Sequence, residues 1–369
     1  MDRPLAGLKV VELARILAGP WCGQLLADLG AEVIKVERPD GGDDTRSWGP
    51  PFAADGNAAY FHGCNRGKAS IAIDLKSAEG QRAVRELVAG ADVLIENFKV
   101  GDLAAYGLDH VSLRAVNERL IYCSITGFGQ TGPYASRPGY DFIIQAMGGL
   151  MAVTGEPDGE PMRAGVAIAD LFTGLYAATA ILAALRAREA TGQGCHVDLA
   201  LLDVQVAVLA NQAMNYLIGG EVPQRLGNAH PNIAPYQAFP VADGHIILAV
   251  GNDGQFRRLC ALLGLAEEPR FATNAARVRN REALAALLGP ALALRRSDEM
   301  LDTLASVGIP AGPINDIAQV FGDPQVIARG MQIDLDGVPG VASPIVIDGR
   351  RQVAESASPP LSDPLSKHS

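Results

Sequence analysis

The sequence has few cysteines, few histidines and no excess of positive charge. Its five cysteines are widely spaced and odd in number, which argues against a disulfide framework and against a cysteine-bound zinc ion. The six histidines form neither an HExxH motif nor a close pair, so we predict no bound metal. With 41 acidic and 31 basic residues, the net charge of -10 disfavours a general surface for nucleic acid or anionic membranes.

Signals for secretion and membrane insertion are also lacking. The first residues carry no apolar signal core, and the longest apolar stretch, from about Leu175 to Leu185, is too short to span a bilayer. Scattered, unpaired cysteines are typical of a reducing compartment. We therefore expect a soluble cytoplasmic protein. Its 369 residues, of which 48% are hydrophobic, predict two domains with well-buried cores.

The glycine motifs that bind nucleotides are incomplete or absent. The first predicted strand-to-helix turn reads Leu17-Ala-Gly-Pro-Trp-Cys-Gly23, which lacks one glycine of G-x-G-x-x-G and has a proline where a phosphate would approach. Glu37 does end the second predicted strand, the place of a ribose-binding acid. No Walker A sequence is present. Nicotinamide and nucleoside triphosphate chemistry are both disfavoured.

Strands and helices alternate through the first half of the chain. The patterns predict strands over residues 8–14, 32–37, 70–74, 92–96 and 120–125, and helices over 21–29 and 78–89. This alternation predicts an α/β fold with a doubly wound parallel sheet. A glycine- and proline-rich loop over 127–139 follows the last of these strands, where open α/β sheets place their ligands.

The second half indicates a smaller domain. Long helices are predicted over 171–189 and 199–217, and a proline-bearing connector over 223–240 marks a boundary. Further on, the patterns predict a strand over 245–250, helices over 255–263, 281–294 and 298–307, and short strands over 332–335 and 343–347. We predict a large domain over 1–222, a small α+β domain over 223–330, and a C-terminal segment over 331–369 that returns to the large domain. Residues 356–369 are expected to be frayed.

Asp170 stands between an apolar run and a long helix rich in alanine and leucine. A carboxylate at a helix N-terminus lies near partial positive charge and free backbone N–H groups, which can keep it ionised and receive an oxyanion. This geometry suits a carboxylate nucleophile. From these residues alone, however, an ordinary N-cap is the commoner role of such an aspartate.

Eight short motifs in a fixed order carry a family resemblance. They are Leu17-Ala-Gly-Pro20, Gly30-Ala-Glu-Val-Ile-Lys-Val-Glu-Arg38, the segments 65–68, 74–76 and 96–98, Gly127-Phe-Gly-Gln-Thr-Gly-Pro133, Gly139-Tyr-Asp141 and Ala169-Asp170. Together they resemble the family III CoA-transferases, which include formyl-CoA transferase and have the α-methylacyl-CoA racemases as relatives. The resemblance covers nearly the whole chain.

The resemblance assigns the chemistry to Asp170. It implies that this aspartate attacks an acyl-CoA, forms a mixed anhydride, and then carries CoA as a thioester until an acceptor acid takes it. The implied substrates are an acyl-CoA and a free carboxylic acid, with no permanently bound cofactor. The resemblance also implies a homodimer whose two chains are interlocked. A CoA-binding homologue without turnover is one alternative.

By the same resemblance, nine residues bind the CoA moiety. They are Ile16, Leu17, Ala18, Arg38, Leu75, Lys76, Asn97, Phe98 and Lys99. Arginine and lysine can form charge-assisted bonds to the phosphates. Each basic residue could instead be a solvated surface charge, and Phe98 could simply pack in the core. Ala105 stands where formyl-CoA transferase has a further basic residue.

Tyr140 occupies the position where the racemases carry a histidine. Racemisation requires an acid/base pair across an acidic α-carbon, so the tyrosine favours transfer over a racemase or epimerase activity. The side chain is predicted to line the acyl pocket or to donate a hydrogen bond near Asp170. A core aromatic is the alternative, and the neighbouring Asp141 could cap the helix that begins there.

Two further segments are predicted to contribute to the acyl site. Gly251 and Gly254 match the glycine loop that closes over the site in formyl-CoA transferase, although an ordinary strand-to-helix turn also favours these residues. Residues 225–236 are typical of family members that act on dicarboxylates, and a plain linker is the alternative. We therefore expect succinate or a related dicarboxylate among the substrates.

Overall fold

The computed structural model describes residues 3–362, which divide into two compact units. The large unit comprises the described residues of Met1–Leu150, Ala164–Ala210 and Pro324–Ser369, and the small unit comprises Met151–Arg163 and Asn211–Asp323. The predicted boundaries followed residues 222 and 330, whereas these units divide after 210 and 323. Residues 151–163 belong to the small unit, where Gly227 N donates to Gly155 O at 3.0 Å.

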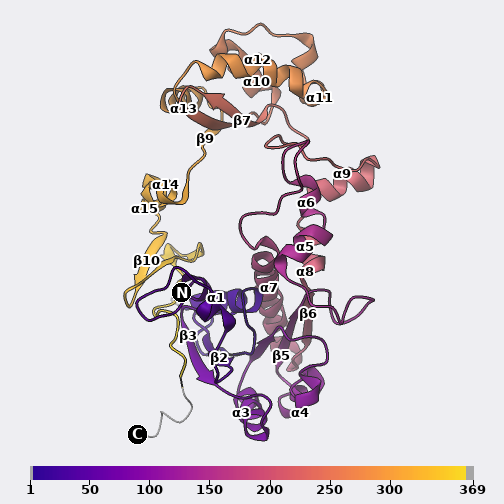
Figure 1. Cartoon of the computed structure of the whole chain (residues 1–369), viewed down its shortest axis with the longest axis vertical. Coiled ribbons are helices and arrows are strands. Elements are labelled where there is room, and N and C mark those ends of the chain that lie inside the picture. The colour runs from indigo at the N-terminus through magenta and orange to yellow at the C-terminus, as the bar shows by residue number, and fades with distance from the viewer. Residues whose placement is uncertain (1–2, 363–369) are drawn as a thin grey trace. The chain divides into compact units, whose positions relative to one another are not determined.

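A six-stranded parallel sheet forms the centre of the large unit (Figure 1). Its strands are β1 (Lys9–Glu12), β2 (Glu32–Glu37), β3 (Lys68–Ala72), β4 (Val93–Glu96), β5 (Ile121–Thr126) and β6 (His196–Ala200). Their spatial order is β3-β2-β1-β4-β5-β6, so the winding direction reverses between β1 and β4. The predicted doubly wound α/β fold is confirmed.

Both faces of this sheet are buried: neighbouring residues of each strand point to opposite sides, and a hydrophobic core lies on each side. Val10, Val93 and Ile121 pack in one core cluster, and the adjoining Val11, Leu94 and Tyr122 pack in the other. The helices of this unit are α1 (Ala18–Asp28), α2 (Ala59–His62), α3 (Ala78–Ala89), α4 (His110–Val116), α5 (Asp141–Met147), α7 (Ile168–Thr191), α8 (Leu201–Ala207) and α15 (Pro324–Ala328). A short α6 (Leu150–Val153) stands at the division between the units.

Helix α7 packs closely against α1 because residue 174 is a glycine. A Cβ atom there would lie 2.7 Å from the carbonyl oxygen of Ala18 and 2.9 Å from a ring carbon of Trp21. The helix has 24 residues, and an 18-residue window of it has a mean hydropathy of 1.7. By length and composition it could cross a membrane, so the prediction that this stretch is too short was wrong. Buried helices of soluble proteins pass the same test.

Two local predictions of secondary structure were wrong. The sequence predicted one helix over 199–217, but the chain forms edge strand β6, then α8, a break at Ala210 with φ of 46°, and α9 (Asn211–Gly219). The predicted strand over 343–347 is reduced to β12 (Val346–Ile347), which pairs with β13 (Arg350–Arg351). Strand β6 lies at the edge of the sheet and needs only one buried face, so it contains polar residues and lacks the continuous apolar pattern of the central strands.

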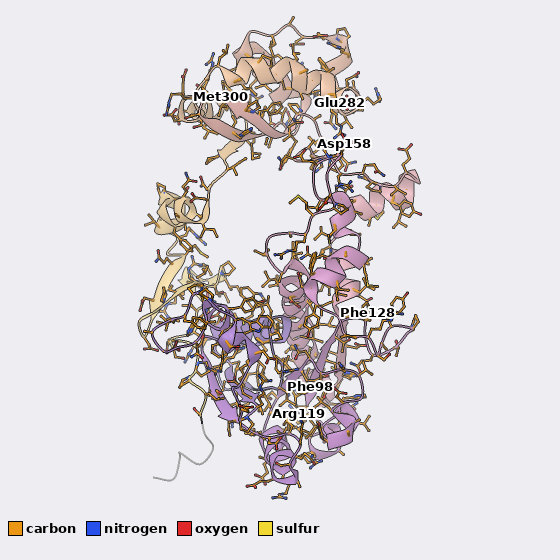
Figure 2. The ribbon with its side chains drawn as sticks, viewed as in Figure 1. Phe98, Arg119, Phe128, Asp158, Glu282 and Met300 are labelled. Atoms are coloured by element: carbon orange, nitrogen blue, oxygen red, sulfur yellow. The ribbon has the colours of Figure 1, made fainter. Side chains whose placement is uncertain are left out.

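The small unit is an α+β structure with its own core, as predicted. Strands β7 (Tyr236–Val241), β8 (Gly244–Ala249) and β9 (Ala311–Pro313) form an antiparallel sheet. Its helices after α9 are α10 (Asp253–Leu263), α11 (Asn274–Arg279), α12 (Arg281–Ala293), α13 (Ser297–Ser306) and α14 (Ile317–Gly322). Met300, labelled in Figure 2, is fully buried in this core together with Phe239 and Leu288.

The C-terminal segment packs on the large unit. It contains the hairpin of β10 (Gln332–Leu335) and β11 (Val338–Val341). Arg66 Nη1 donates to Val341 O at 2.8 Å, and Gly67 N donates to Ser356 O at 3.0 Å. Arg46 Nη2 donates to Pro359 O at 3.1 Å. Residues 356–362 are thus tied down, contrary to the predicted fraying, while 363–369 lie outside the described residues.

Candidate active site

A pocket lies at the carboxyl edge of the parallel sheet, where the strand order reverses. It is lined by segments 15–18 after β1, 97–100 after β4 and 125–127 at the end of β5, together with residues 137–140 and Asp170. Open α/β sheets bind ligands at this topological switch point. The cavity of about 200 Å³ is smaller than a site that encloses a drug-sized ligand, so a larger ligand would place only part of itself there.

The structure brings eight of the predicted site residues together in this pocket. They are Ile16, Leu17, Ala18, Asn97, Phe98, Lys99, Tyr140 and Asp170. Three predicted CoA contacts, Arg38, Leu75 and Lys76, do not line it. Arg38 is exposed and pairs with Asp44 at 2.6 Å, Lys76 is exposed, and Leu75 packs against the core.

Backbone contacts shape the loop that carries Tyr140. A Cβ on Gly127 would lie 2.5 Å from the Cα of Gly139, so both positions need glycine for the two backbones to approach. Tyr140 follows directly, as the N-cap residue of α5, and its side chain is 62% exposed. It faces the pocket, and the core-aromatic alternative is therefore wrong.

Asp170 is the third residue of α7 and does not cap it. The N-cap residue is Ala167, which offers no side-chain cap. The capping bonds come instead from Asp141, whose Oδ1 accepts from Ala169 N at 2.8 Å and from Asp170 N at 3.4 Å. Its Oδ2 accepts from Gln145 Nε2 at 2.7 Å. Asp141 therefore holds the start of α7 rather than the start of its own helix.

The pKa of Asp170 is raised to about 7, because burial disfavours the charged carboxylate and the charge of Asp141 adds repulsion. The sequence indicated that the helix N-terminus can keep this group ionised, whereas in the structure burial and Asp141 oppose its ionisation. Two carboxylates close together cannot both ionise freely. The ionised form of Asp170 is consequently more basic than the carboxylate of an ordinary carboxylic acid in water.

Three residues near Asp170 escaped the sequence analysis. Tyr60 on α2 has its pKa raised to about 12 by burial and then by the charge of Asp170, so the two side chains are electrostatic neighbours. Arg15 and Arg137 line the pocket and add positive charge to it. Arg15 adjoins the predicted segment 16–18, and Arg137 stands in the glycine- and proline-rich loop. These positions in the chain were the only sequence features that could have indicated a place in the pocket.

The arginines are held at the pocket by neighbouring side chains. Arg15 Nη1 lies 3.3 Å from Asp44 Oδ2, and its guanidinium lies 5.7 Å from the ring centre of Phe98. The guanidinium of Arg137 lies 4.0 Å from the ring centre of Tyr134. Together with Lys99 these groups form a cationic rim suited to phosphate oxygens, and Asp102 lines the same pocket.

Comparison with known proteins agrees with this geometry. A family model described as CoA-transferase family III matches residues 5–363. The chain belongs to this family. It is 57% identical to the succinate–glutarate CoA-transferase of Agrobacterium fabrum, and the match covers 98% of this chain and 93% of that protein. It is 44% identical to the succinyl-CoA:glutarate CoA-transferase of Mus musculus, over 99% of this chain and 85% of that protein.

A solved structure shows the same fold. The crystal structure of a CAIB/BAIF family protein from Brucella suis is 61% identical, with a TM-score of 0.88, and the match covers 98% of this chain and 97% of that one. As a family III CoA-transferase, the protein uses a CoA thioester as a substrate. Within residues 3–362, no group of three or more histidine, cysteine, aspartate or glutamate side chains could hold a metal ion.

The two predicted glycines of this CoA-transferase lie in the small unit, at the start of α10. Gly251 N donates to Gln255 Oε1 at 2.8 Å, and Asn252 Oδ1 accepts from Gln255 N at 2.9 Å, which caps the helix. The segment thus serves as a strand-to-helix turn, and closure of Gly251 and Gly254 over the acyl site stays a prediction. Arg225 binds within the same unit, to Glu156 O at 3.2 Å and Gly159 O at 2.9 Å.

Proposed function

We propose that this enzyme moves CoA between succinyl-CoA and a free dicarboxylate, with glutarate as the preferred acceptor, through covalent intermediates on Asp170. The observation that carries the proposal is the place of Asp170, beside a cationic rim in the pocket at the sheet's switch point. The acids come from the names of relatives that are 57% and 44% identical to this chain.

The reaction begins with an attack by the Asp170 carboxylate on the thioester carbonyl of succinyl-CoA. The carbon–sulfur bond breaks, CoA leaves as a thiolate, and a mixed anhydride joins Asp170 to succinate. The thiolate then attacks the Asp170 carbonyl of this anhydride and releases succinate. Asp170 is left as a CoA thioester, and the free energy of the original thioester is retained without ATP.

Glutarate reverses these steps. Its carboxylate attacks the aspartyl thioester, which expels CoA thiolate and forms a second anhydride. The thiolate attacks the glutaryl carbonyl, giving glutaryl-CoA and free Asp170. A nucleophile whose pKa is raised to about 7 is more basic than the acceptor carboxylate, which favours its attack on the thioester. Arg15, Lys99 and Arg137 are the residues that we assign to the CoA phosphates.

The test of the substrates is a panel of acids with succinyl-CoA as the donor. We expect kcat/KM for glutarate to exceed that for butyrate by on the order of 100-fold, because a site built for a second carboxylate leaves polar groups unpaired when it is missing. Product CoA thioesters are measured by liquid chromatography. Equal rates with mono- and dicarboxylates would overturn the dicarboxylate assignment.

The reaction rate should depend on the ionisation of Asp170. We expect kcat/KM for the acyl-CoA to fall as the pH is lowered through about 7, since only the ionised carboxylate attacks. In Asp141→Asn, the acidic limb should move to lower pH, because a like charge is lost while the amide oxygen can still accept from Ala169 N.

The matched control for this pH profile is Asp109→Asn. Asp109 also caps a helix, accepting from Val111 N at 3.0 Å, but does not line the pocket of Asp170. Its substitution should leave the limb in place. A limb that stays unchanged in Asp141→Asn, or a flat profile in the wild type between pH 5 and 8, would contradict the assignment.

We also propose that the enzyme is a cytoplasmic homodimer with interlocked chains. Apolar side chains of α7 are exposed in the single chain, among them Leu175 at 44% and Tyr176 at 45%, and a second copy would cover them. Light scattering should give a solution mass twice that of one chain. A monomer in dilute solution, or activity recovered with the membrane fraction, would count against these assignments.

A further inference from the structure

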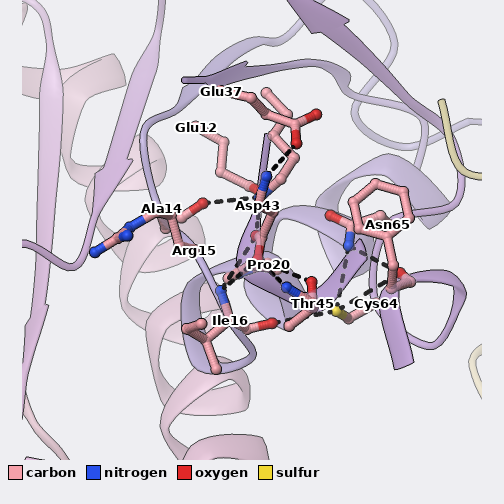
Figure 3. A network of polar contacts seen from close by, with 12 residues as sticks. Glu12, Ala14, Arg15, Ile16, Pro20, Glu37, Asp43, Thr45, Cys64 and Asn65 are labelled. Carbon is pink, nitrogen blue, oxygen red and sulfur yellow. Dashed lines mark hydrogen bonds and ion pairs between the residues drawn. The ribbon is translucent and has the colours of Figure 1, made fainter. Parts of the chain in front are cut away.

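Four buried charged side chains form a network next to the pocket-lining turn that follows β1. Glu12 Oε1 accepts from Lys35 Nζ and from Lys68 Nζ, both at 3.0 Å, and Lys35 Nζ lies 2.9 Å from Asp43 Oδ2. All four side chains have no exposed surface. Two acids and two bases balance one another, as buried charges must. Figure 3 shows Glu12 and Asp43 around this turn.

The network binds the turn's backbone at three places. Lys35 Nζ donates to Ala14 O at 2.8 Å, the Asp43 carboxylate accepts from Ile16 N at 3.2 and 3.3 Å, and Lys68 Nζ donates to Pro20 O at 2.8 Å. These points lie before, within and after the pocket-lining residues 16–18. The charges therefore hold the turn that carries part of the site.

Ile16 needs such an anchor because its backbone is strained. Its φ of 72° lies in the left-handed region, where a β-branched side chain is a genuine outlier. Strained residues persist only where their surroundings over-determine them, and they cluster at functional sites. Ile16 N is bound by Asp43, and Asn97 binds the backbone of the preceding Arg15 on both sides, at 2.9 Å to its N and 2.6 Å to its O.

Asp43 is itself fixed in place. Its Oδ1 accepts from Thr45 N at 3.0 Å and from Thr45 Oγ1 at 2.8 Å, and its Oδ2 pairs with Lys35. Burial opposes ionisation, but the positive charge of Lys35 and the bonds from Thr45 hold its pKa below the usual range. The anchor is therefore a charged, fully bonded carboxylate.

We propose that Asp43, held by Lys35, is a positioning residue for CoA transfer. It keeps Ile16 in its left-handed conformation and so presents Leu17 and Ala18 to the pocket that contains Asp170. Ala18 also begins α1, which packs against α7 one turn beyond Asp170. A small displacement of this turn would therefore move groups that line the reacting acyl-CoA. The inference rests on the CoA-transfer activity proposed above.

A matched buried carboxylate distinguishes positioning from simple stabilisation. Asp28, at the other end of α1, is paired with Arg66 at 2.6 Å and does not line the pocket. We expect Asp43→Asn and Asp28→Asn both to lower the melting temperature. Only Asp43→Asn should lower kcat at saturating substrates, by roughly tenfold to 100-fold, the effect of misplacing a site by about 1 Å.

Removal of the strain provides a second readout. Glycine adopts the left-handed conformation without an anchor, so the loss of kcat caused by Asp43→Asn should be several-fold smaller when measured against an Ile16→Gly parent. Equal losses in the two backgrounds would overturn the proposal. So would an unchanged kcat in Asp43→Asn accompanied by a melting temperature as low as that of Asp28→Asn.

A milder variant covers the case in which Asp43→Asn does not fold. Thr45→Val removes the hydroxyl bond to Asp43 and leaves every charge in place, and it should lower kcat by roughly two- to fivefold. An unchanged kcat in this variant would count against positioning. If wild type is inactive with glutarate, the substrate assignment fails. The role of Asp43 is still tested, because its variants are compared using the most active acid of the panel.

Discussion

Replacing Asp170 with alanine should lower kcat for CoA transfer by on the order of 10⁴-fold or more, because removal of a covalent nucleophile eliminates the only path through an anhydride. CoA should still bind, since the cationic rim formed by Arg15, Lys99 and Arg137 is untouched. Transfer is measured with succinyl-CoA and glutarate, and CoA binding by calorimetry.

The aspartyl intermediate can be observed directly. Hydroxylamine added to wild type during turnover should convert the thioester on Asp170 to a hydroxamate, which peptide mass spectrometry locates. Asp203→Ala is the matched control, because Asp203 is an exposed aspartate at the third position of α8, as Asp170 is in α7. It should retain kcat within about twofold. The nucleophile assignment would be refuted if Asp170→Ala kept its activity and wild type gave no hydroxamate on the peptide that contains Asp170.

Substituting Glu12 with glutamine should lower the free energy of unfolding of the large unit by about 3–5 kcal/mol, since two buried lysines lose a shared partner. Both Lys35 and Lys68 have fully buried side chains and bind Glu12 at 3.0 Å. Tryptophan fluorescence during denaturant unfolding reports this unit alone, because the two tryptophans of the chain are Trp21 and Trp48.

An exposed ion pair provides the comparison for this stability measurement. Glu189 pairs with Arg186 on the surface of α7, where their side chains are 67% and 82% exposed. Glu189→Gln should change the free energy of unfolding by less than about 0.5 kcal/mol, because solvent screens such pairs. A similar small change in Glu12→Gln would show that the buried lysines can lose their protons or reach water at little cost.

The sheet could be predicted from sequence where its strands are buried on both faces. Residues 92–96 and 120–125 are apolar runs, and the structure places β4 and β5 there. Strand β6 was missed because His196 and Asp198 interrupt its apolar pattern. His196 bonds to Ser124 at 2.9 Å, a contact between residues far apart in the chain that no local pattern contains.

The candidate site was predictable only in part, for a related reason. Segments 16–18 and 97–99 follow strands, so motif and topology agreed on them. Tyr60 and Arg137 reach the site from loops and short helices whose course depends on the whole fold. The capping of α7 by Asp141 likewise joins residues 28 positions apart. The sequence therefore could not show that the aspartate at the start of α5 caps α7 and not its own helix.

Because of the position of Asp141, the pKa of Asp170 and the placement of Asp170 at the start of α7 depend on the same carboxylate. The same carboxylate that receives the first amides of α7 also repels the charge of Asp170. A bound acid or a substitution in the residues that pack against α5 could displace this helix. Such a displacement would weaken the capping of α7 and change the pKa of Asp170 at the same time. An acceptor that shifts this helix could therefore change its own working pH range.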